Sequence, residues 1–141
     1  MNSQDLLSTI QRNSQICQIT IRRALDTVMC SSLRGTLQAQ LREYDTLETE
    51  ALEIAHQRGW ELPGLEMLHG IMTDRKVRFR LFLRNKDSGI AELLIRTSTN
   101  GLISSLKDLH QYNGSDFRVR ILSQKMLDCA DAHIRQLQPY L

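Results

Sequence analysis

The segment LRGTLQAQLREYDTLETEALEIAHQRG, residues 33–59, decides the fold of this chain. Its large apolar side chains recur every three or four residues, and this spacing predicts an amphipathic α-helix. They are Leu33, Leu37, Leu41, Tyr44, Leu47, Ala51 and Ile54. Gly59 suits the left-handed conformation that closes a helix, and Pro63 follows soon after. The segment therefore predicts one long helix that ends near Arg58.

The same periodicity continues on both sides of this helix. The predicted helices span about 2–29, 33–58, 64–84, 88–111 and 115–138. Short breaks between the first two helices and between the last two make each pair antiparallel neighbours. Residues 64–84 fit a helix or an alternating strand, and we favour a short helix because a single strand would have no partner. The expected fold is one all-α domain, residues 1–141, with an extra connecting helix between the second and third long helices of a four-helix bundle.

Composition favours the same class. The 141 residues are 41% hydrophobic and 24% charged, as in an ordinary soluble globular chain. Two prolines, seven glycines and 5% aromatic residues are few for an all-β sandwich, which needs many turns. The formal net charge of +2 is too small to indicate a polyanionic partner by itself.

The cysteines and the N-terminus indicate a compartment. Cys17, Cys30 and Cys129 are odd in number and widely spaced, which predicts neither a disulfide framework nor a structural zinc site. The N-terminus lacks the pattern of a signal peptide, and no apolar run approaches the roughly 18 residues of a membrane span. We therefore expect a cytoplasmic protein.

One local motif suggests iron. Glu53 and His56 have the Glu-x-x-His spacing of di-iron four-helix bundles. With about 100° of rotation per residue, Glu53 points roughly 180° away from the apolar stripe of its helix, and His56 roughly 110–120° away. Ligands of di-iron sites project into the bundle core. We therefore expect this motif on the surface.

Inward polar residues offer a second route to a metal. Glu48 lies at the core edge of the second helix, Glu92 lies at a similar place on the third, and His133 lies mid-seam on the last. Folding the last hairpin at Asn113 places Glu92 beside His133, whereas Glu48 falls in a layer roughly 10–15 Å away. We predict no cofactor, and keep iron, manganese or zinc at Glu48, Glu92 and His133 as the alternative.

The segment DRKVRFRLFLRNK, residues 74–86, concentrates positive charge among apolar residues. Its basic residues are Arg75, Lys76, Arg78, Arg80, Arg84 and Lys86. They could contact nucleic-acid phosphates or an anionic membrane surface. The plainer interpretation is a connecting helix whose basic side chains extend from the bundle into water.

Signatures of catalysis are missing from the sequence. The chain contains no phosphate-binding glycine loop and no GxSxG nucleophile motif. Cys17 and Cys129 fall on or near apolar helix faces, where inert core thiols are expected. Whether the chain is an enzyme stays open, and the sequence leans against it.

The run SGIAELLIRTSTNGLISSLKDLHQY, residues 88–112, and the closing Pro139-Tyr140-Leu141 resemble a set of small bacterial proteins of the ferritin-like four-helix class. The helix over 33–58 is similar as well. The resemblance implies a ferritin-like bundle without an established activity, and paired metal-ligand motifs such as those of ferritins and rubrerythrins are largely missing here.

The leading functional expectation is a non-enzymatic structural or protein-interaction bundle. Ile90, Leu93 and Leu94 are expected on the far side of the third long helix, where the connecting helix or a second subunit would cover them, and they motivate the prediction of a homodimer. The alternatives are a degenerate metal-binding bundle and a module that binds an anionic partner through residues 74–86.

Overall fold

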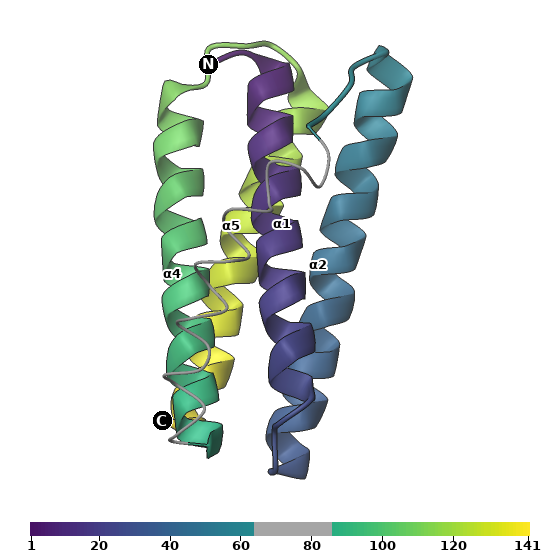
Figure 1. Ribbon diagram of the computed structural model, residues 1–141. Helices are drawn as coiled ribbons and strands as arrows, with labels where there is room; N and C mark the ends of the chain where they lie inside the picture. Colours follow the sequence, from purple (N-terminus) through teal and green to yellow (C-terminus); the bar gives the residue numbers. More distant parts are fainter. Residues whose placement is uncertain (64–85) are drawn as a thin grey trace.

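The structure is a computed structural model that describes residues 1–63 and 86–141. Within these ranges the chain forms four α-helices, a closing 3₁₀ turn and no strand (Figure 1). The elements are α1 (Ser3–Leu25), α2 (Ser31–Arg58), α4 (Lys86–Gln111), α5 (Phe117–Leu137) and η3 (Gln138–Tyr140). The predicted all-α class is therefore confirmed for the described residues, while the predicted connecting helix at 64–84 lies outside them.

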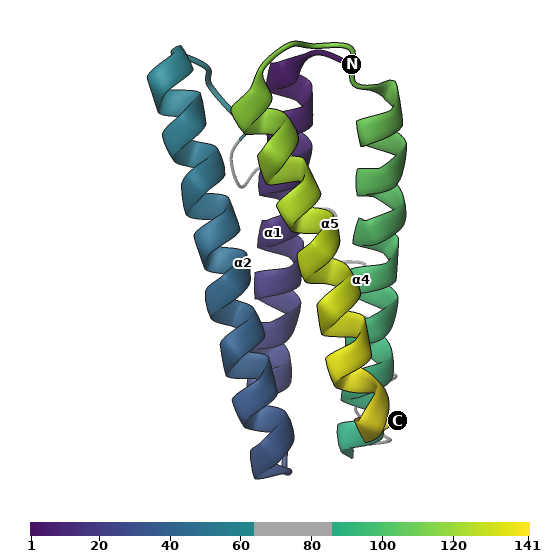
Figure 2. The same ribbon diagram turned by 180° about the vertical axis from the view of Figure 1, so that it is seen from behind.

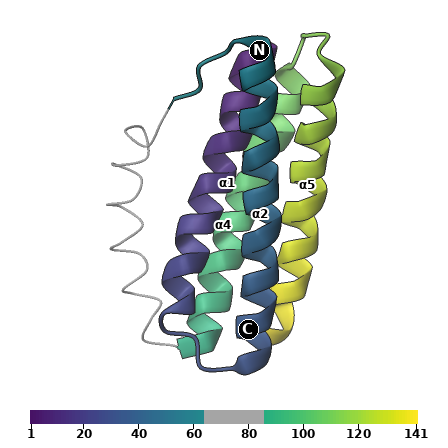
Figure 3. The same cartoon turned by 90° about the vertical axis from the view of Figure 1, so that its right-hand side faces the viewer.

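The helices form two antiparallel hairpins, α1 with α2 and α4 with α5. The hairpins pack together so that α1 lies beside α4 and α2 lies beside α5 (Figures 1 and 2). Seen from the side, α2 stands in front, between α1 and α5 (Figure 3). Helices α2 and α4 run in the same direction, and the two chain termini lie at opposite ends of the bundle. The edge between α2 and α5 carries the candidate site.

Side-chain caps define the helix ends. Asn2 caps α1 by accepting a 2.8 Å hydrogen bond from the Asp5 backbone N–H. Gly59 ends α2 with a φ of 70°, the left-handed conformation that the sequence predicted. At the start of α5, Asp116 accepts a 3.4 Å bond from the Val119 backbone N–H.

Helix α1 stops at Leu25, earlier than the expected boundary near residue 29. The reason is a side-chain cap from α2, because the Arg34 guanidinium donates to the carbonyls of Leu25 at 3.1 Å and Val28 at 2.9 Å. The Asp87 carboxylate then accepts from both backbone N–H groups that follow, Met29 and Cys30, at 2.8 Å each. These bonds tie the α1–α2 turn to the beginning of α4.

The core face of α4 differs from the expected one. Ile90, Leu93 and Leu94 are buried, with exposed fractions of 1%, 6% and 3%, so their placement on the far side was wrong. The exposed apolar side chains of α4 are instead Ile103 and Leu106. The error arose because small and polar residues occupy part of the buried face, namely Thr97, Ser98 and Ser105. The homodimer prediction thus loses the observation on which it rested.

Candidate metal centre

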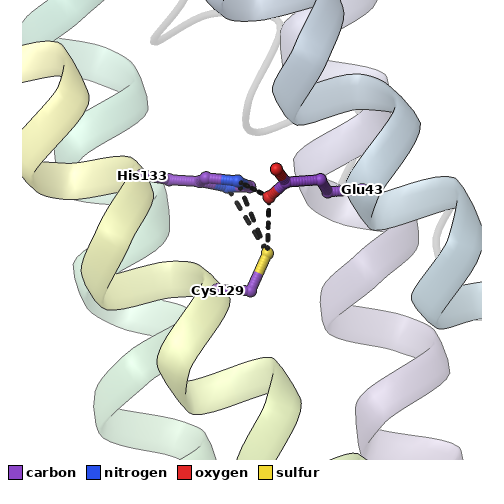
Figure 4. A group of neighbouring side chains, drawn as sticks. All are labelled: Glu43, Cys129 and His133. Atoms are coloured by element: carbon purple, nitrogen blue, oxygen red, sulfur yellow. Dashed lines mark hydrogen bonds and ion pairs between the residues drawn. The ribbon is translucent and has the colours of Figure 1, made fainter.

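Three potential metal ligands meet between α2 and α5: Glu43, Cys129 and His133 (Figure 4). The Nε2 atom of His133 lies 2.6 Å from Oε2 of Glu43. The Cys129 Sγ atom lies 3.4 Å from the same Nε2 and 3.5 Å from the same Oε2. One nitrogen, one oxygen and one sulfur therefore surround a common point.

The helices position these side chains by simple spacing. Cys129 and His133 are four residues apart on α5 and so project from neighbouring turns of one face. Glu43 reaches them from α2, next to Tyr44 in the sequence. The Tyr44 ring meets the imidazole edge-on, at a centroid distance of 4.7 Å and an angle of 79°. This contact fixes the plane of the His133 ring from the core side.

A second contact from α2 holds the backbone at the site. The Gln40 amide donates to the His133 carbonyl at 3.4 Å and to Oε1 of Gln136 at 3.1 Å. Because Gln40 is buried, with 1% exposed, its bond to the His133 carbonyl lies out of water, whereas the bond to Gln136 is partly buried. Helix α2 thus contacts His133 through three side chains, at its ring edge, its Nε2 atom and its carbonyl.

The site has a buried side and an open side. The His133 side chain is 0% exposed, whereas the Glu43 side chain is 56% exposed. Burial lowers the pKa of His133, and the Glu43 carboxylate counteracts this only in part. Burial and the negative charge of Glu43 raise the pKa of the Cys129 thiol. At neutral pH the cluster therefore holds a neutral imidazole, which donates from Nε2 to Glu43, and a protonated thiol.

This arrangement is unsuited to a cysteine nucleophile. A catalytic Cys–His pair oriented by a carboxylate uses both ring nitrogens, one toward the thiol and one toward the carboxylate. Here the shortest thiol contact and the carboxylate contact share Nε2. A thiol with a raised pKa also supplies little thiolate.

The same arrangement fits a metal ion. In a tetrahedral zinc site, Zn–S bonds of about 2.3 Å and Zn–N or Zn–O bonds of about 2.0–2.1 Å put the ligand atoms about 3.3–3.6 Å apart. Both distances from Cys129 Sγ, 3.4 and 3.5 Å, lie in this range. Only the 2.6 Å separation of Nε2 and Oε2 must widen, by about 0.7 Å, when a metal replaces the proton between them. The exposed Glu43 side chain can supply that movement.

Of the three ligands considered from sequence, only His133 belongs to this cluster. The structure pairs it with Glu43, whereas the hairpin argument had placed Glu92 beside it. Glu92 instead forms a 2.9 Å ion pair with Arg96 one turn away on α4. Glu48 accepts a 3.4 Å bond from Gln18 of α1. The position of Glu92 was predicted wrongly for the same reason as the buried face of α4. The rotation assumed for α4 about its own axis turned Glu92 inward.

The surface motif behaves as expected. Glu53 and His56 are both exposed, so the Glu-x-x-His spacing of α2 does not reach the core. The basic segment 74–86 lies outside the described residues except for Lys86, which is exposed at the start of α4. An anionic partner for Arg75, Lys76, Arg78, Arg80 and Arg84 therefore stays a prediction.

Sequence reasoning missed two of the three ligands. Cys129 was interpreted as an inert thiol, although its four-residue spacing from His133 was a usable signal. Glu43 gave no comparable signal, because it lies beside the core stripe of α2 and is largely exposed. Only the register of α2 against α5 brings it to His133.

A comparison of the chain with family models, curated proteins and solved structures finds no match. The resemblance to ferritin-like bundles accordingly stays an expectation. Among the described helices we find none whose length and apolarity would suffice for a membrane span.

Proposed function

We propose that this chain is a non-enzymatic helical bundle that binds one zinc ion through Glu43, Cys129 and His133. The observation that carries the proposal is the convergence of three different donor atoms, within 4.8 Å of one another, from two helices. Three protein ligands leave a fourth tetrahedral position, which water fills on the open side of Glu43. The proposal combines two expectations from the sequence, a non-enzymatic structural bundle and a metal-binding bundle, and replaces the metal ligands considered there with a new set.

The donor set favours zinc over iron or manganese. Thiolate and imidazole are preferred ligands of zinc, whereas manganese and di-iron sites are rich in carboxylates. The cluster contains one carboxylate, Glu43, and Glu48 and Glu92 have their own partners elsewhere in the bundle. Ferritin-like architecture remains part of the proposal, supported by the parallel course of α2 and α4. A reduced Cys129 suits the cytoplasm.

Titration with Co²⁺, a spectroscopic substitute for zinc, tests the ligand set. We expect about one Co²⁺ per chain, a sulfur-to-cobalt charge-transfer band and visible bands of tetrahedral intensity. Zinc should displace the cobalt and remove both sets of bands.

Variants with matched chemistry identify the ligands. Cys129→Ser should abolish the charge-transfer band, and Glu43→Gln should weaken zinc binding by at least about tenfold. Glu92→Gln is the control, because it removes a carboxylate of similar exposure from α4 and should leave binding unchanged. Absence of cobalt and zinc binding in the wild-type protein, with its thiols shown to be reduced, would overturn the proposal.

A further inference from the structure

A series of polar side-chain contacts joins α2 to α5 and to the residues that flank α5, along most of the length of both helices. The pairs, in order along α2, are Ser32–Tyr140, Gln40–Gln136, Glu43–His133, Glu50–Lys125, Gln57–Arg118 and Arg58–Asp116. The partners of α2 follow in reverse order, as antiparallel helices require. We call this set the α2–α5 seam. It is one of the two edges along which the hairpins meet.

Three of the six contacts of the seam are weak individually. Glu50 and Lys125 form an ion pair at 3.5 Å with side chains 28% and 55% exposed, and exposed pairs of this kind contribute little to stability. Ser32–Tyr140 and Gln57–Arg118 are also at the surface. Between the stronger contacts made by Gln40, Glu43 and Arg58, a local separation of the hairpins along the seam would therefore break only weak polar interactions.

The opposite edge, between α1 and α4, is tied at both ends by hydrogen bonds to backbone groups. The N-terminal ammonium of Met1 donates to the Gln111 carbonyl at 3.0 Å, and the Asn113 N–H donates back to the Met1 carbonyl at 3.2 Å. At the other end Asp87 holds the α1–α2 turn. Opening along α2 and α5 can leave these ties in place.

His133 is the point of the seam at which the contacts concentrate. Its ring meets Tyr44, its Nε2 meets Glu43 and its carbonyl accepts from Gln40. Tyr44 is fully buried and extends from this ring into the core. A bond that fixes His133 to α2 therefore also fixes the core packing on both sides of the seam.

We propose that the zinc ion is a clamp that closes the α2–α5 seam, so that docking of the two hairpins depends on the metal. The inference rests on the proposed zinc site. Its physical basis is that Cys129 and His133 lie on α5 and Glu43 lies on α2, so a metal bound to all three cannot persist when the helices part. Separation of the seam then requires loss of a coordinate bond instead of one hydrogen bond to a solvated carboxylate.

Hydrogen exchange on the full chain, followed by mass spectrometry with zinc or with a chelator, tests the clamp. At zinc about 100-fold above its Kd, opening that releases the metal should be suppressed about 100-fold. We expect slower exchange in the central turns of α2 and α5, around Tyr44 and Met126. Exchange should change little in α1 around Ile10 and in α4 around Ile90.

Two variants keep the result interpretable without removing a buried side chain. Cys129→Ser and Glu43→Gln alter partly exposed ligands, and both should lose the zinc-dependent protection while remaining helical. Glu50→Gln, which breaks a seam pair away from the metal, should keep it.

The outcomes separate this inference from the proposed function. No cobalt or zinc binding refutes the site and with it the clamp. Stoichiometric zinc binding with equal protection of all four helices, or with protection confined to Cys129 and His133, leaves the site intact and overturns the clamp.

Discussion

The contact between Glu43 and His133 allows the geometry of the site to be tested without any metal. A double-mutant cycle with Glu43→Ala and His133→Leu, measured in chelator, isolates the coupling between the two side chains. His133→Leu places an apolar side chain of comparable size in the buried position. Glu43→Ala changes a side chain that is 56% exposed. Neither variant should therefore disturb the rest of the bundle.

The expected coupling free energy between Glu43 and His133 follows from the geometry of their contact. A hydrogen bond to a charged group contributes about 1.5–3 kcal/mol, and the 2.6 Å distance is that of a strong contact. Water around the exposed carboxylate screens its charge, so we take the lower end of this range or slightly less, about 1–1.5 kcal/mol. In the wild-type background, Glu43→Ala should reduce the free energy of unfolding by about 1–1.5 kcal/mol. In a chain that already carries His133→Leu, the same substitution should change it by nearly nothing.

Urea denaturation, followed by far-ultraviolet circular dichroism, gives the four free energies of unfolding. The same cycle on Glu50 and Lys125 is the control, because that exposed pair at 3.5 Å should couple by less than about 0.5 kcal/mol. A coupling of Glu43 with His133 no larger than that of the control pair would refute the reasoning, since the imidazole would then have another partner in solution.

Three further predictions concern the frame that holds the site. Gly59→Ala should destabilise the chain by about 1 kcal/mol because the φ of Gly59 is 70°. Gly35→Ala should stabilise the chain by about 0.5–1 kcal/mol because Gly35 lies within a helix, with open space around an added methyl group. Equal changes in melting temperature for the two variants would contradict this pair of predictions. Asp87→Ala should lower the free energy of unfolding in urea by about 0.5–1.5 kcal/mol because it removes two hydrogen bonds to backbone N–H groups that water can reach, and an unchanged midpoint would count against that tie. The Arg58 guanidinium lowers the pKa of Asp116 below its usual 3.8, so this pair adds stability that is present above that pH and is lost as the pH falls through the folded-state pKa. In urea titrations, Asp116→Asn should be less stable than wild type near pH 7, and the difference should shrink at lower pH. A difference that stays constant with pH would show that the charge of Asp116 plays no part.

The sequence was a sound guide wherever one strong pattern determined the result. In α2 the stripe from Leu33 to Ile54, closed by Gly59, predicted the helix, its core face and its C-terminal cap. The same wheel correctly placed Glu53 and His56 in water and His133 in the core. These positions depend on periodicity within one helix, which a single sequence contains.

The pattern failed where the apolar residues of a helix do not identify its buried face. Leucines and isoleucines surround much of α4, and Thr97 and Ser98 occupy part of its buried face. Glu43 illustrates a second limit, because its role depends on the register between α2 and α5. Neither helix encodes that register alone, since it follows from how two hairpins pack.

The most direct test of the central claim is the metal content of protein purified without an affinity tag and without added metal. Elemental analysis should find about one zinc per chain in the wild type and substantially less in Cys129→Ser purified in parallel. Equal zinc in the two proteins, or no zinc in the wild type together with no uptake when zinc is added to the reduced protein, would contradict a site built from Glu43, Cys129 and His133.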